Sequence, residues 1–577
     1  MARLNNRHVA ELFSNIADLL QIKGENRFKI LAYRRAAENL AGLDRDLNDV
    51  WAAGELANVP GVGQAIHDKI DELLRTGRLG FWENLSAEIP PSLIEVLAIP
   101  DVGPKTARAM WQELGLTTVE QVKAAAEQGR LRQLPGLGPK SETKILAGIA
   151  AAAGRAADGR VHLGVAWPAM TALIEALEPL PEVERIQHAG SLRRFRPTIG
   201  DLDLLVATEA PAPVMDAFRG LPQVETVLLG GETKTSVRLL NGLQVDLRCL
   251  EPARWGTALQ YFTGSQSHNI KIRELARRQG LSLNEYAFTR ADGSTIVCPT
   301  EGEVYATLGL AYIPPELRED RGEIEAAQAD QLPEMLAVED IRGEVHCHST
   351  WSDGRGSIED MARAALARGY EYLAITDHSQ SLGVTGGLTP ERLRAQRAEI
   401  AGVQARVPGL RLLQGAEVEI KADGSLDYPD EVLAGLDFVV ASIHTGLRQD
   451  REKLTRRMLN AIRHPQVHLI GHPSGRLLTR REAGDFDMEA ILRAAAETGT
   501  MLEINAAPER LDLDEVHIRR AVTLGVNLII NCDAHHPDQF NNLRFGVATA
   551  RRGWATAGQI ANTRSIDGLL ALARGDR

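Results

Sequence analysis

The chain has 577 residues and a formal net charge of −12, with 44% hydrophobic and 25% charged residues. This composition is typical of globular protein and excludes a chain that is disordered throughout. At roughly 100–200 residues per domain, the length predicts several domains. No run approaches the roughly 18 consecutive apolar residues of a membrane span, and the first residues lack the pattern of a secretory signal. Four cysteines are too few for a disulfide scaffold, so we expect a cytoplasmic protein with no membrane partner.

The negative charge is concentrated in one segment. Residues 311–340 hold 2 basic and 9 acidic side chains and so contribute −7 of the net −12. A run of like charge is usually solvated, so we expect an acidic linker between two bodies that fold separately. Outside this segment the chain is nearly neutral, and local basic patches such as Arg193, Arg194 and Arg196 can act on phosphates.

Residues 1–155 space their apolar side chains at helical intervals and predict an all-helical region. Within it, NVPGVGQAI, AIPDVGPKTA and QLPGLGPKSE repeat the pattern apolar–Pro–x–apolar–Gly before a helical run. Glycine turns of this kind bring backbone N–H groups close to an anion at a helix N-terminus. One copy would be a plain turn, but three copies resemble the helix-hairpin-helix motif, which holds the DNA backbone without reading its sequence. The glycines concerned are Gly61, Gly63, Gly103, Gly136 and Gly138.

Residues 160–310 mix strand-like and helical runs and predict an α+β body. In GDLDLL, Asp201 and Asp203 stand two residues apart, so on a strand both carboxylates face one side. Such a pair is unfavourable unless a divalent cation lies between the two groups. Asp246, in VDLR on a neighbouring strand, would complete a two-metal site suited to in-line displacement.

Five segments of this body, GSLRR, GDLDLL, VDLR, YFTGSQSHN and LNEYAF, resemble family X DNA polymerases in order and spacing. The Ser191 hydroxyl and the Arg194 guanidinium would hold a triphosphate. The resemblance implies two Mg or Mn ions at the three aspartates and a template-strand contact at Arg273. Gln266 departs from the aspartate of the family, which leaves that nucleotide contact open. The nucleotide-binding set implied by the resemblance is Gly190, Ser191, Arg194, Gly200, Tyr261, Phe262, Gly264 and Asn269.

Polymerase beta, a member of that family, also removes a 5′-deoxyribose phosphate through a Schiff-base lysine that follows its first hairpin. Lys69 stands at the matching position, and Lys29 and Tyr33 match other positions of that site. Ala65 replaces a lysine that would contact phosphate. A Schiff-base lysine must be neutral to attack, whereas a helical lysine is usually a solvated charge, so lyase activity stays open.

Residues 342–577 alternate strand and helix about seven times and predict a barrel-like β/α domain. A histidine or an acid stands near the end of almost every strand, where barrel active sites lie. Strand alternation predicts that Cys347, Cys532 and His536 face away and leaves Glu419 as a candidate beside Glu417. Mixed imidazole and carboxylate ligands suit Mn, Zn or Fe, and nine ligands indicate two or three ions. The nine are His346, His348, Asp353, His378, Glu417, His444, His472, Asp533 and His535.

The nine ligands resemble those of the PHP (polymerase and histidinol phosphatase) domain, and only this resemblance ranks Glu417 ahead of Glu419. A family X polymerase followed by this domain is the PolX architecture of bacteria and archaea. The resemblance implies a multidomain chain. Its expected parts are an N-terminal helical DNA-binding domain (1–85), helix-hairpin-helix fingers (86–155), a nucleotidyltransferase palm (156–255), a thumb-like nucleotide-selection subdomain (256–315), the acidic linker (316–341) and a PHP barrel of seven β/α units (342–577).

The resemblance implies a monomeric repair polymerase that fills short gaps in gapped or nicked double-stranded DNA with dNTPs, in the cytoplasm at the nucleoid. Its PHP domain would be a metal-dependent 3′–5′ exonuclease, and in some members of the family it is linked to cleavage at abasic sites. Two alternatives remain open. The PHP domain could be a small-molecule phosphatase, or the chain could be a DNA-end-binding module in which one or both sites are inactive.

Overall fold

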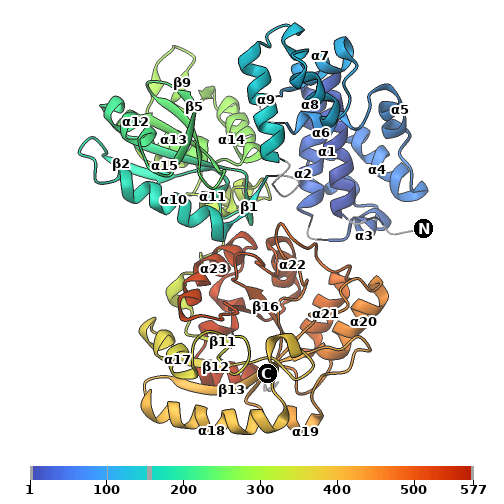
Figure 1. Ribbon diagram of the computed structural model, residues 1–577, viewed down its shortest axis with the longest axis vertical. Helices are drawn as coiled ribbons and strands as arrows, with labels where there is room; N and C mark the ends of the chain where they lie inside the picture. Colours follow the sequence, from blue (N-terminus) through green and yellow to red (C-terminus); the bar gives the residue numbers. More distant parts are fainter. Residues whose placement is uncertain (1–3, 5, 44, 100–101, 153–158, 574–577) are drawn as a thin grey trace. The chain divides into compact units, whose positions relative to one another are not determined.

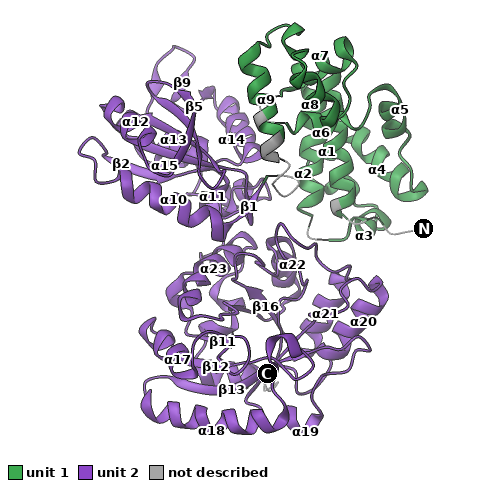
Figure 2. Ribbon diagram, viewed as in Figure 1, with its two compact units in different colours: residues 1–159 green, residues 160–577 purple. Residues whose placement is uncertain are grey.

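The computed structural model describes residues 4, 6–43, 45–99, 102–152 and 159–573. It divides into two compact units, residues 1–159 and residues 160–577 (Figure 2). Pro100 and Asp101 of the second glycine repeat lie outside the described residues, as does the predicted boundary after residue 155. None of the helices that the structure describes is long and apolar enough to cross a membrane.

The first unit is helical, as predicted, and its described residues form no strand (Figure 1). Its apolar stripes meet in one core that includes Phe13, Leu40, Ile70, Leu93 and Met110. The helices are α1 (Asn6–Lys23), α2 (Arg27–Ala41), α3 (Leu47–Ala52), α4 (Gln64–Thr76), α5 (Gly80–Glu88), α6 (Leu93–Leu97), α7 (Pro104–Leu114), α8 (Val119–Glu127) and α9 (Pro139–Ala152).

The second unit begins with a five-stranded sheet in the order β2-β4-β7-β6-β5, which forms the palm. Strands β4 and β7 are parallel neighbours, and they set the positions of the aspartates. The elements are β1 (Val161–His162), α10 (Leu163–Leu177), β2 (Arg185–His188), α11 (Gly190–Arg193), β3 (Thr198–Ile199), β4 (Asp201–Ala207), α12 (Pro211–Arg219), β5 (Val224–Gly230), β6 (Lys234–Leu239) and β7 (Gln244–Leu250).

A smaller subdomain follows, in which helices pack around a three-stranded sheet of order β10-β9-β8. Ile272, Phe288 and Tyr305 are fully buried in its core. The elements are α13 (Trp255–Thr263), α14 (Gln266–Arg278), β8 (Leu281–Leu283), β9 (Phe288–Arg290), β10 (Thr295–Ile296), α15 (Glu301–Thr307) and α16 (Glu323–Gln328).

The remainder forms a nearly closed barrel of seven parallel strands in sequence order, so the predicted seven-unit β/α domain is confirmed. A bridge between Cys347 and Ala534 joins the two ends of the sheet. The strands are β11 (Gly343–Cys347), β12 (Tyr372–Ile375), β13 (Arg411–Glu419), β14 (Phe438–Ser442), β15 (Leu469–Ile470), β16 (Met501–Asn505) and β17 (Leu528–Asn531). The helices are α17 (Ile358–Ala367), α18 (Pro390–Arg406), α19 (Asp430–Leu433), α20 (Arg451–Ile462), α21 (Met488–Thr498), α22 (Glu515–Leu524), α23 (Leu543–Arg552) and α24 (Ile566–Ala573).

Alternation along the strands separates two apolar layers of the barrel. Residues such as Leu413 and Phe438 form a cluster with Leu569 of α24, whereas their sequence neighbours Leu412 and Val439 belong to a second cluster with the surrounding helices. Because side chains two residues apart share a face, Glu417 lies on the same face as Leu413. The first layer therefore continues toward the carboxyl ends of the strands as a layer of polar residues.

The expectation of a solvated acidic segment is wrong for residues 316–324, whereas Glu325, Asp330, Glu334, Glu339 and Asp340 are exposed as expected. Glu316, Arg318, Asp320 and Glu323 are all buried, and the apolar neighbours Leu317 and Ile324 belong to the core of the thumb subdomain. Each acid has a basic partner elsewhere in the chain, as in the pairs Lys271–Asp320 at 2.5 Å and Arg551–Glu316 at 2.9 Å. A charge count cannot reveal such pairing, because the partners come from distant segments.

The palm and the barrel also share a core, which overturns the expectation of separately folding bodies. Leu511 and Phe545 of the barrel domain are buried in the palm cluster. The rings of Trp167 and Phe545 lie with their centroids 5.9 Å apart. Residues 160–577 accordingly form one compact unit, while the individual domain boundaries within it stay predictions.

Candidate active sites

Three carboxylates meet at the edge of the palm sheet. Asp203 on β4 stands directly opposite Asp246 on β7 in the parallel register, and Asp201 lies two residues before Asp203. Burial and the charges of Asp201 and Asp246 raise the pKa of Asp203 to about 7. Burial alone would raise the pKa of Asp246, but hydrogen bonds from Lys234 and Ser236 hold it below its ordinary value. Mutual repulsion of this kind suits carboxylates that bind divalent cations.

Lys234 is a residue of this site that the sequence reasoning missed. Its ammonium nitrogen lies 2.7 Å from Oδ2 of Asp246, and Gln244 donates a hydrogen bond to the other oxygen at 3.0 Å. Lys234 begins β6, which pairs antiparallel with β7. Only the strand pairing brings this cation to Asp246, so no local sequence signal could have identified it.

The position of Asp203 explains why residue 190 is a glycine. It adopts the left-handed backbone conformation, with φ of +61°, and a Cβ atom there would lie 2.2 Å from Oδ2 of Asp203. Glycine is therefore required on both conformational and steric grounds. Ser191 comes next, in the short helix α11, so the GS pair lies directly beside the carboxylates. Gly200 has a different neighbour, because a Cβ atom there would lie 3.1 Å from the Arg160 guanidinium.

The two arginines after Ser191 have different surroundings. Arg193 forms a structural ion pair with Glu301 at 2.6 Å. Arg194 donates to Oε1 of Glu319 at 3.1 Å and to the backbone carbonyl of Thr263. Arg194 therefore lies where palm and thumb meet, beside the predicted nucleotide site. Glu319 is a second residue that the sequence reasoning missed, because it was assigned to a solvated linker.

The YFTGS segment ends helix α13 and turns into α14. Gly264 has φ of +70°, and a Cβ atom there would lie 3.0 Å from the Arg194 guanidinium. The Asn269 side chain donates to the carbonyl of Tyr261 at 2.7 Å and accepts from the Gln260 amide at 2.8 Å. These bonds place Asn269 and Tyr261 side by side on neighbouring helices.

Two further predicted contacts lie on the same two helices. Arg273, one turn after Asn269, donates to the backbone carbonyl of that residue at 3.2 Å. The Phe262 ring lies under the Arg248 guanidinium, with 4.6 Å between the guanidinium carbon and the ring centroid. Gln266, the position that departs from the family, is exposed at the start of α14.

The hairpin glycines of the first unit lie at helix entries. Gly63 and Gly103 immediately precede α4 and α7, and a Cβ atom on either would meet no other atom within 4 Å. Gly138, which precedes α9, is open in the same way. Gly61 and Gly136 have φ of +79° and +81°. Three helix N-termini are therefore open to an approaching anion, as phosphate binding by backbone N–H groups requires.

Lys69 lies in a small cationic and aromatic cluster on the same unit. Its ammonium nitrogen donates to the carbonyl of Ala65 at 2.9 Å and lies 5.0 Å from the centroid of the Phe81 ring. Lys29 lies 5.6 Å from the same ring, and Tyr33 stacks on it with centroids 5.7 Å apart. The structure thus brings together Lys69, Lys29 and Tyr33, and adds Phe81, which the sequence analysis did not include.

The nine predicted ligands of the barrel domain converge at the carboxyl ends of its strands. Within the described residues they provide three groups whose candidate ligand atoms all lie within 4.8 Å of one another. His472 belongs to none of the three, but its Nε2 atom lies 2.9 Å from Oε1 of Glu417. The groups are His348, Asp353, His378 and His535; His346, His348 and Asp533; and His378, Glu417 and His444.

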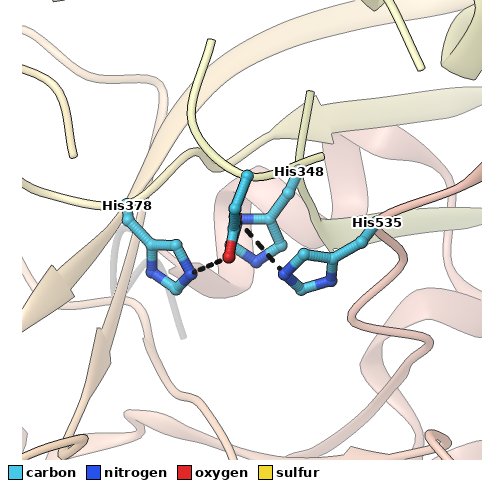
Figure 3. Close-up of side chains that lie close together, drawn as sticks. His348, His378 and His535 are labelled. Carbon is cyan, nitrogen blue, oxygen red and sulfur yellow. Dashed lines mark ion pairs between the residues drawn. The ribbon is translucent and has the colours of Figure 1, made fainter. Parts of the chain in front are cut away.

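His348 and His378 each belong to two of these groups, which therefore adjoin one another. Figure 3 shows His348, His378 and His535 with their rings converging on one region. The His348 and His535 rings stack with centroids 4.2 Å apart. Asp353 lies 3.4 Å from Nε2 of His535 and 3.6 Å from Nε2 of His378. Glu417 is the central carboxylate, with the nearest atoms of His378 and His444 at 2.8 and 3.2 Å.

Electrostatics divide the histidines of the cluster into two kinds. Burial and the neighbouring rings of His535 and His378 lower the pKa of His348 to about 3. Burial alone would lower the pKa of His378, but Glu417 and Asp353 raise it to about 10. The raised pKa of His378 shows that the carboxylates of the cluster favour positive charge beside them. Without metal, protonated histidines such as His378 would supply that charge.

Orphaned nitrogen atoms give an independent test of whether metals fit. Nε2 of His346 and Nδ1 of His348 are buried and have no hydrogen-bond partner. Buried polar atoms without partners are unfavourable, and imidazole nitrogens next to carboxylates are the donors that Mn, Zn or Fe prefer. The residues of this site therefore fit a group of transition-metal ions.

Carboxylates outside the three groups contact the predicted histidine ligands, and Glu419 is one of them. Nδ1 of His444 lies 2.8 Å from Oε2 of Glu419, and Nδ1 of His346 lies 2.7 Å from Oε1 of Glu503. Carboxylates that bond the outer nitrogen of a ligating histidine fix its ring and tautomer. Glu419 therefore supports a ligand, while Glu417 occupies the cluster. Strand alternation in MLEINA could have identified Glu503, which shares a face with Met501.

Arg510 is a cation at the cluster that no sequence pattern indicated. Its Nε atom lies 3.5 Å from Oδ2 of Asp533, and the side chain is 17% exposed. Arg476 fixes the loop that carries Arg510 by donating to the backbone carbonyl of Arg510 at 2.8 Å.

The residues predicted to face away from the cluster do so. Cys347 and Cys532 belong to the apolar cluster between the strands and the surrounding helices, and His536 caps the helical turn Pro537–Asn542. All four cysteines of the chain are buried and form no disulfide.

Comparison with known families defines the class of protein. Four family models match: a helix-hairpin-helix domain over residues 4–79, a SAM-like helix-hairpin-helix tandem over 93–151, the DNA polymerase beta thumb over 258–319 and the PHP domain over 344–507. A chain with these parts in this order is a family X-type polymerase core joined to a PHP domain.

Relatives along the whole chain identify the family. The chain is 38% identical over 566 residues to DNA polymerase/3′-5′ exonuclease PolX of Bacillus subtilis (strain 168), covering 98% of each chain. It is 24% identical over 344 residues to DNA polymerase lambda of Rattus norvegicus, covering 54% and 56% of the two chains. A probable phosphatase of Thermoanaerobacter sp. (strain X514) is 28% identical over 232 residues, which is 38% of this chain and 89% of that protein. The chain belongs to the PolX family of DNA polymerases.

Proposed function

We propose that this chain fills short gaps in DNA at the three-carboxylate site of the palm and degrades DNA from the 3′ end at the barrel cluster. The observation that carries the proposal is the presence of two separate clusters of candidate metal ligands in one unit. One is Asp201, Asp203 and Asp246 on neighbouring strands, and the other is the set of barrel groups around His348, His378 and Glu417. The name of the Bacillus subtilis relative joins the same two activities. The likeness to DNA polymerase lambda supports a gap-filling repair polymerase, and we place this activity in base excision repair.

At the palm, Asp201, Asp203 and Asp246 would hold two Mg or Mn ions. Such ions activate the primer hydroxyl and stabilise the leaving oxygen in displacement at phosphorus. Ser191 and Arg194 would bind the triphosphate as hydrogen-bond donors. Tyr261, Phe262, Gly264 and Asn269 would form the surface for the sugar and base of the incoming dNTP, with Arg273 on the template strand.

At the barrel, the nine ligands would hold two or three Mn, Zn or Fe ions, which polarise a phosphodiester and lower the pKa of bound water. Glu503 and Glu419 keep the His346 and His444 rings in place. Arg510, beside Asp533, would bind a phosphate oxygen of the DNA strand as a charged donor.

The first unit would hold the DNA. Helix entries at Gly63, Gly103 and Gly138 are open to phosphates, so binding should not depend on sequence and should weaken steeply with salt. Gapped or nicked duplex with a 5′-phosphate is the expected substrate. We propose that the chain acts as a monomer at the nucleoid in the cytoplasm, where its DNA substrate would be.

One labelled gapped duplex tests the proposal. With Mn²⁺ and dNTPs the primer should lengthen, and with Mn²⁺ alone it should shorten and release deoxynucleoside monophosphates. Failure to extend or to shorten would reject the corresponding half of the proposal. Asp246→Ala should abolish extension, because two carboxylates cannot hold both ions.

A small-molecule phosphatase is a second candidate for the barrel, because the similarity to probable phosphatases covers this domain. Inorganic phosphate released from a monoester, with no nucleotide released from DNA, would favour the phosphatase.

Lyase activity of Lys69 needs a separate test. Borohydride should trap a covalent adduct with a 5′-deoxyribose phosphate, and Lys69→Ala should abolish the trapping.

A further inference from the structure

An arginine of the barrel domain reaches the nucleotide site of the palm. Arg552 ends α23, the helix that follows the last metal-ligand loop (Figure 1). Its side chain is 1% exposed. One terminal nitrogen donates to the backbone carbonyl of Arg194 at 2.7 Å and to Oε1 of Glu319 at 2.9 Å. The other donates to Oε1 of Glu515 at 2.8 Å.

These bonds hold both the backbone and the side chain of Arg194. Its carbonyl accepts from Arg552, and its guanidinium donates to Oε1 of Glu319, the atom that Arg552 also holds. Its remaining bond goes to the carbonyl of Thr263, one residue before Gly264. The Arg194 side chain is only 12% exposed. The orientation of this guanidinium therefore depends on Glu319 as well as on Thr263. Of the two contacts that Glu319 makes with Arg552 and Arg196, the one with Arg552 is the shorter.

The charges around this contact do not cancel. Arg196 lies 3.9 Å from Glu319 and 3.6 Å from Glu515, and Arg321 lies 3.8 Å from Glu515. Together with Arg194 and Arg552, the cluster contains four guanidinium groups against two carboxylates, so two formal positive charges remain. The side chains of Arg196 and Arg321 are 36% and 26% exposed, so the excess positive charge reaches the surface, where it favours an anion nearby. A triphosphate at Arg194 would supply that anion.

We infer that Arg552 is a positioning residue for nucleotide binding, so that the barrel domain sets the dNTP affinity of the palm. The inference rests on the proposed function in one respect, namely that Arg194 contacts the triphosphate. Arg552 would not touch the nucleotide. It acts by holding the Arg194 backbone and the Glu319 carboxylate, and its loss would let the Arg194 side chain move away from the phosphates.

Arg551 offers a matched control. It is the preceding residue of α23 and joins the same two regions, through an ion pair with Glu316 at 2.9 Å and a bond to the Leu336 carbonyl. None of its described bonds involves Arg194. Arg551→Gln thus removes one interdomain ion pair of similar kind while leaving the Arg194 contacts intact.

The experiment measures kcat and KM for dNTP in single-nucleotide gap filling by the full chain. Arg552→Gln should raise KM about tenfold while kcat changes less. Nuclease activity on a single-stranded oligonucleotide should stay within about twofold of wild type. Arg551→Gln should change neither parameter, and Arg552→Lys should restore part of the affinity. An unchanged KM in Arg552→Gln, or an equal rise in Arg551→Gln, would overturn the inference.

A double-mutant cycle separates the inference from the proposed function. If Arg194→Gln alone leaves KM for dNTP unchanged, the assigned role of Arg194 is wrong. If Arg194→Gln raises KM, then adding Arg552→Gln should raise it no further, because both changes remove the same contact. Additive effects would show that Arg552 acts independently and would overturn the inference. Should Arg552→Gln fail to fold, Arg552→Lys takes its place in the cycle, and a KM equal to that of wild type would then reject the proposal.

Discussion

A Cβ atom on Gly190 would lie 2.2 Å from Oδ2 of Asp203. We infer that the glycine of the GS pair is required because the carboxylate of Asp203, which we propose to be catalytic, lies against its α-carbon. We predict that Gly190→Ala reduces primer extension by at least about 100-fold, since a 1 Å displacement of reacting groups has effects of that order. Barrel nuclease activity should remain.

Gly280 is the control for backbone strain in that experiment. It has φ of +75°, but a Cβ atom there would meet nothing within 4 Å. Gly280→Ala should therefore destabilise the fold by ~1 kcal/mol and leave extension intact. Equal loss of extension in both variants would show that conformational strain, and not contact with Asp203, makes Gly190 necessary.

Glu503 should control metal binding at the barrel, although we do not assign it as a ligand. Oε1 of Glu503 lies 2.7 Å from Nδ1 of His346, and Oε2 accepts from the His472 backbone at 2.7 Å. We predict that Glu503→Gln lowers metal affinity by about 10–100-fold, measured by competition with a chelator. Glu399→Gln, which alters an exposed acceptor for Trp351, should leave it unchanged. Normal affinity in Glu503→Gln would reject the orienting role.

Arg510 should affect substrate binding and leave metal binding unchanged. Because its guanidinium lies 3.5 Å from Asp533 at the cluster, Arg510→Ala should raise the nuclease KM for DNA by about tenfold or more, the effect of one lost charge-assisted bond. Metal content should be unchanged, and Arg480→Ala, at an exposed arginine, should have little effect. Loss of bound metal in Arg510→Ala would mean that Arg510 supports Asp533 instead.

His188 gives a prediction for pH. Burial and the nearby charge of Arg193 lower the pKa of His188 to about 4. Because the unfolded histidine titrates near 6.5, the unfolded state binds the proton more readily, and folding stability is lost as pH falls from about 6.5 to about 4. His188→Gln should remove this loss, so its stability relative to wild type should rise by about 1–3 kcal/mol between pH 7 and pH 4.5. Denaturant titrations at both pH values measure it, and a constant difference would contradict the assignment.

Local spacing was enough to predict which acidic and histidine side chains lie close together, although only the family resemblance favoured Glu417 over Glu419. Asp201 and Asp203 share a strand face, and the barrel histidines stand at strand ends, so the chain pattern alone placed them together. The register between β4 and β7 then set Asp203 opposite Asp246. Patterns of this kind are local, because alternation and strand ends are properties of short segments.

Contacts between distant segments could not be predicted in the same way. The acidic residues at 311–340 were expected to be solvated, yet Glu319 binds Arg194 and Arg552 at 3.1 and 2.9 Å. Lys234 and Arg510 reach their sites only through strand pairing and loop packing. The local sequence around a charged residue does not indicate its distant partner. Composition therefore could not show that the first part of this segment, around Glu316–Glu323, is buried in an ion-pair network.

The proposed function requires the chain to perform two reactions at two metal sites. It is tested most directly by measuring extension and degradation of one labelled gapped duplex with Asp201→Ala and His346→Ala, each shown by thermal melting to be folded. We predict that Asp201→Ala loses extension by at least about 100-fold and still degrades the primer, and that His346→Ala does the reverse, because each variant removes ligands from one site only. Loss of both reactions in folded Asp201→Ala would mean that the aspartate site performs both and would contradict the account.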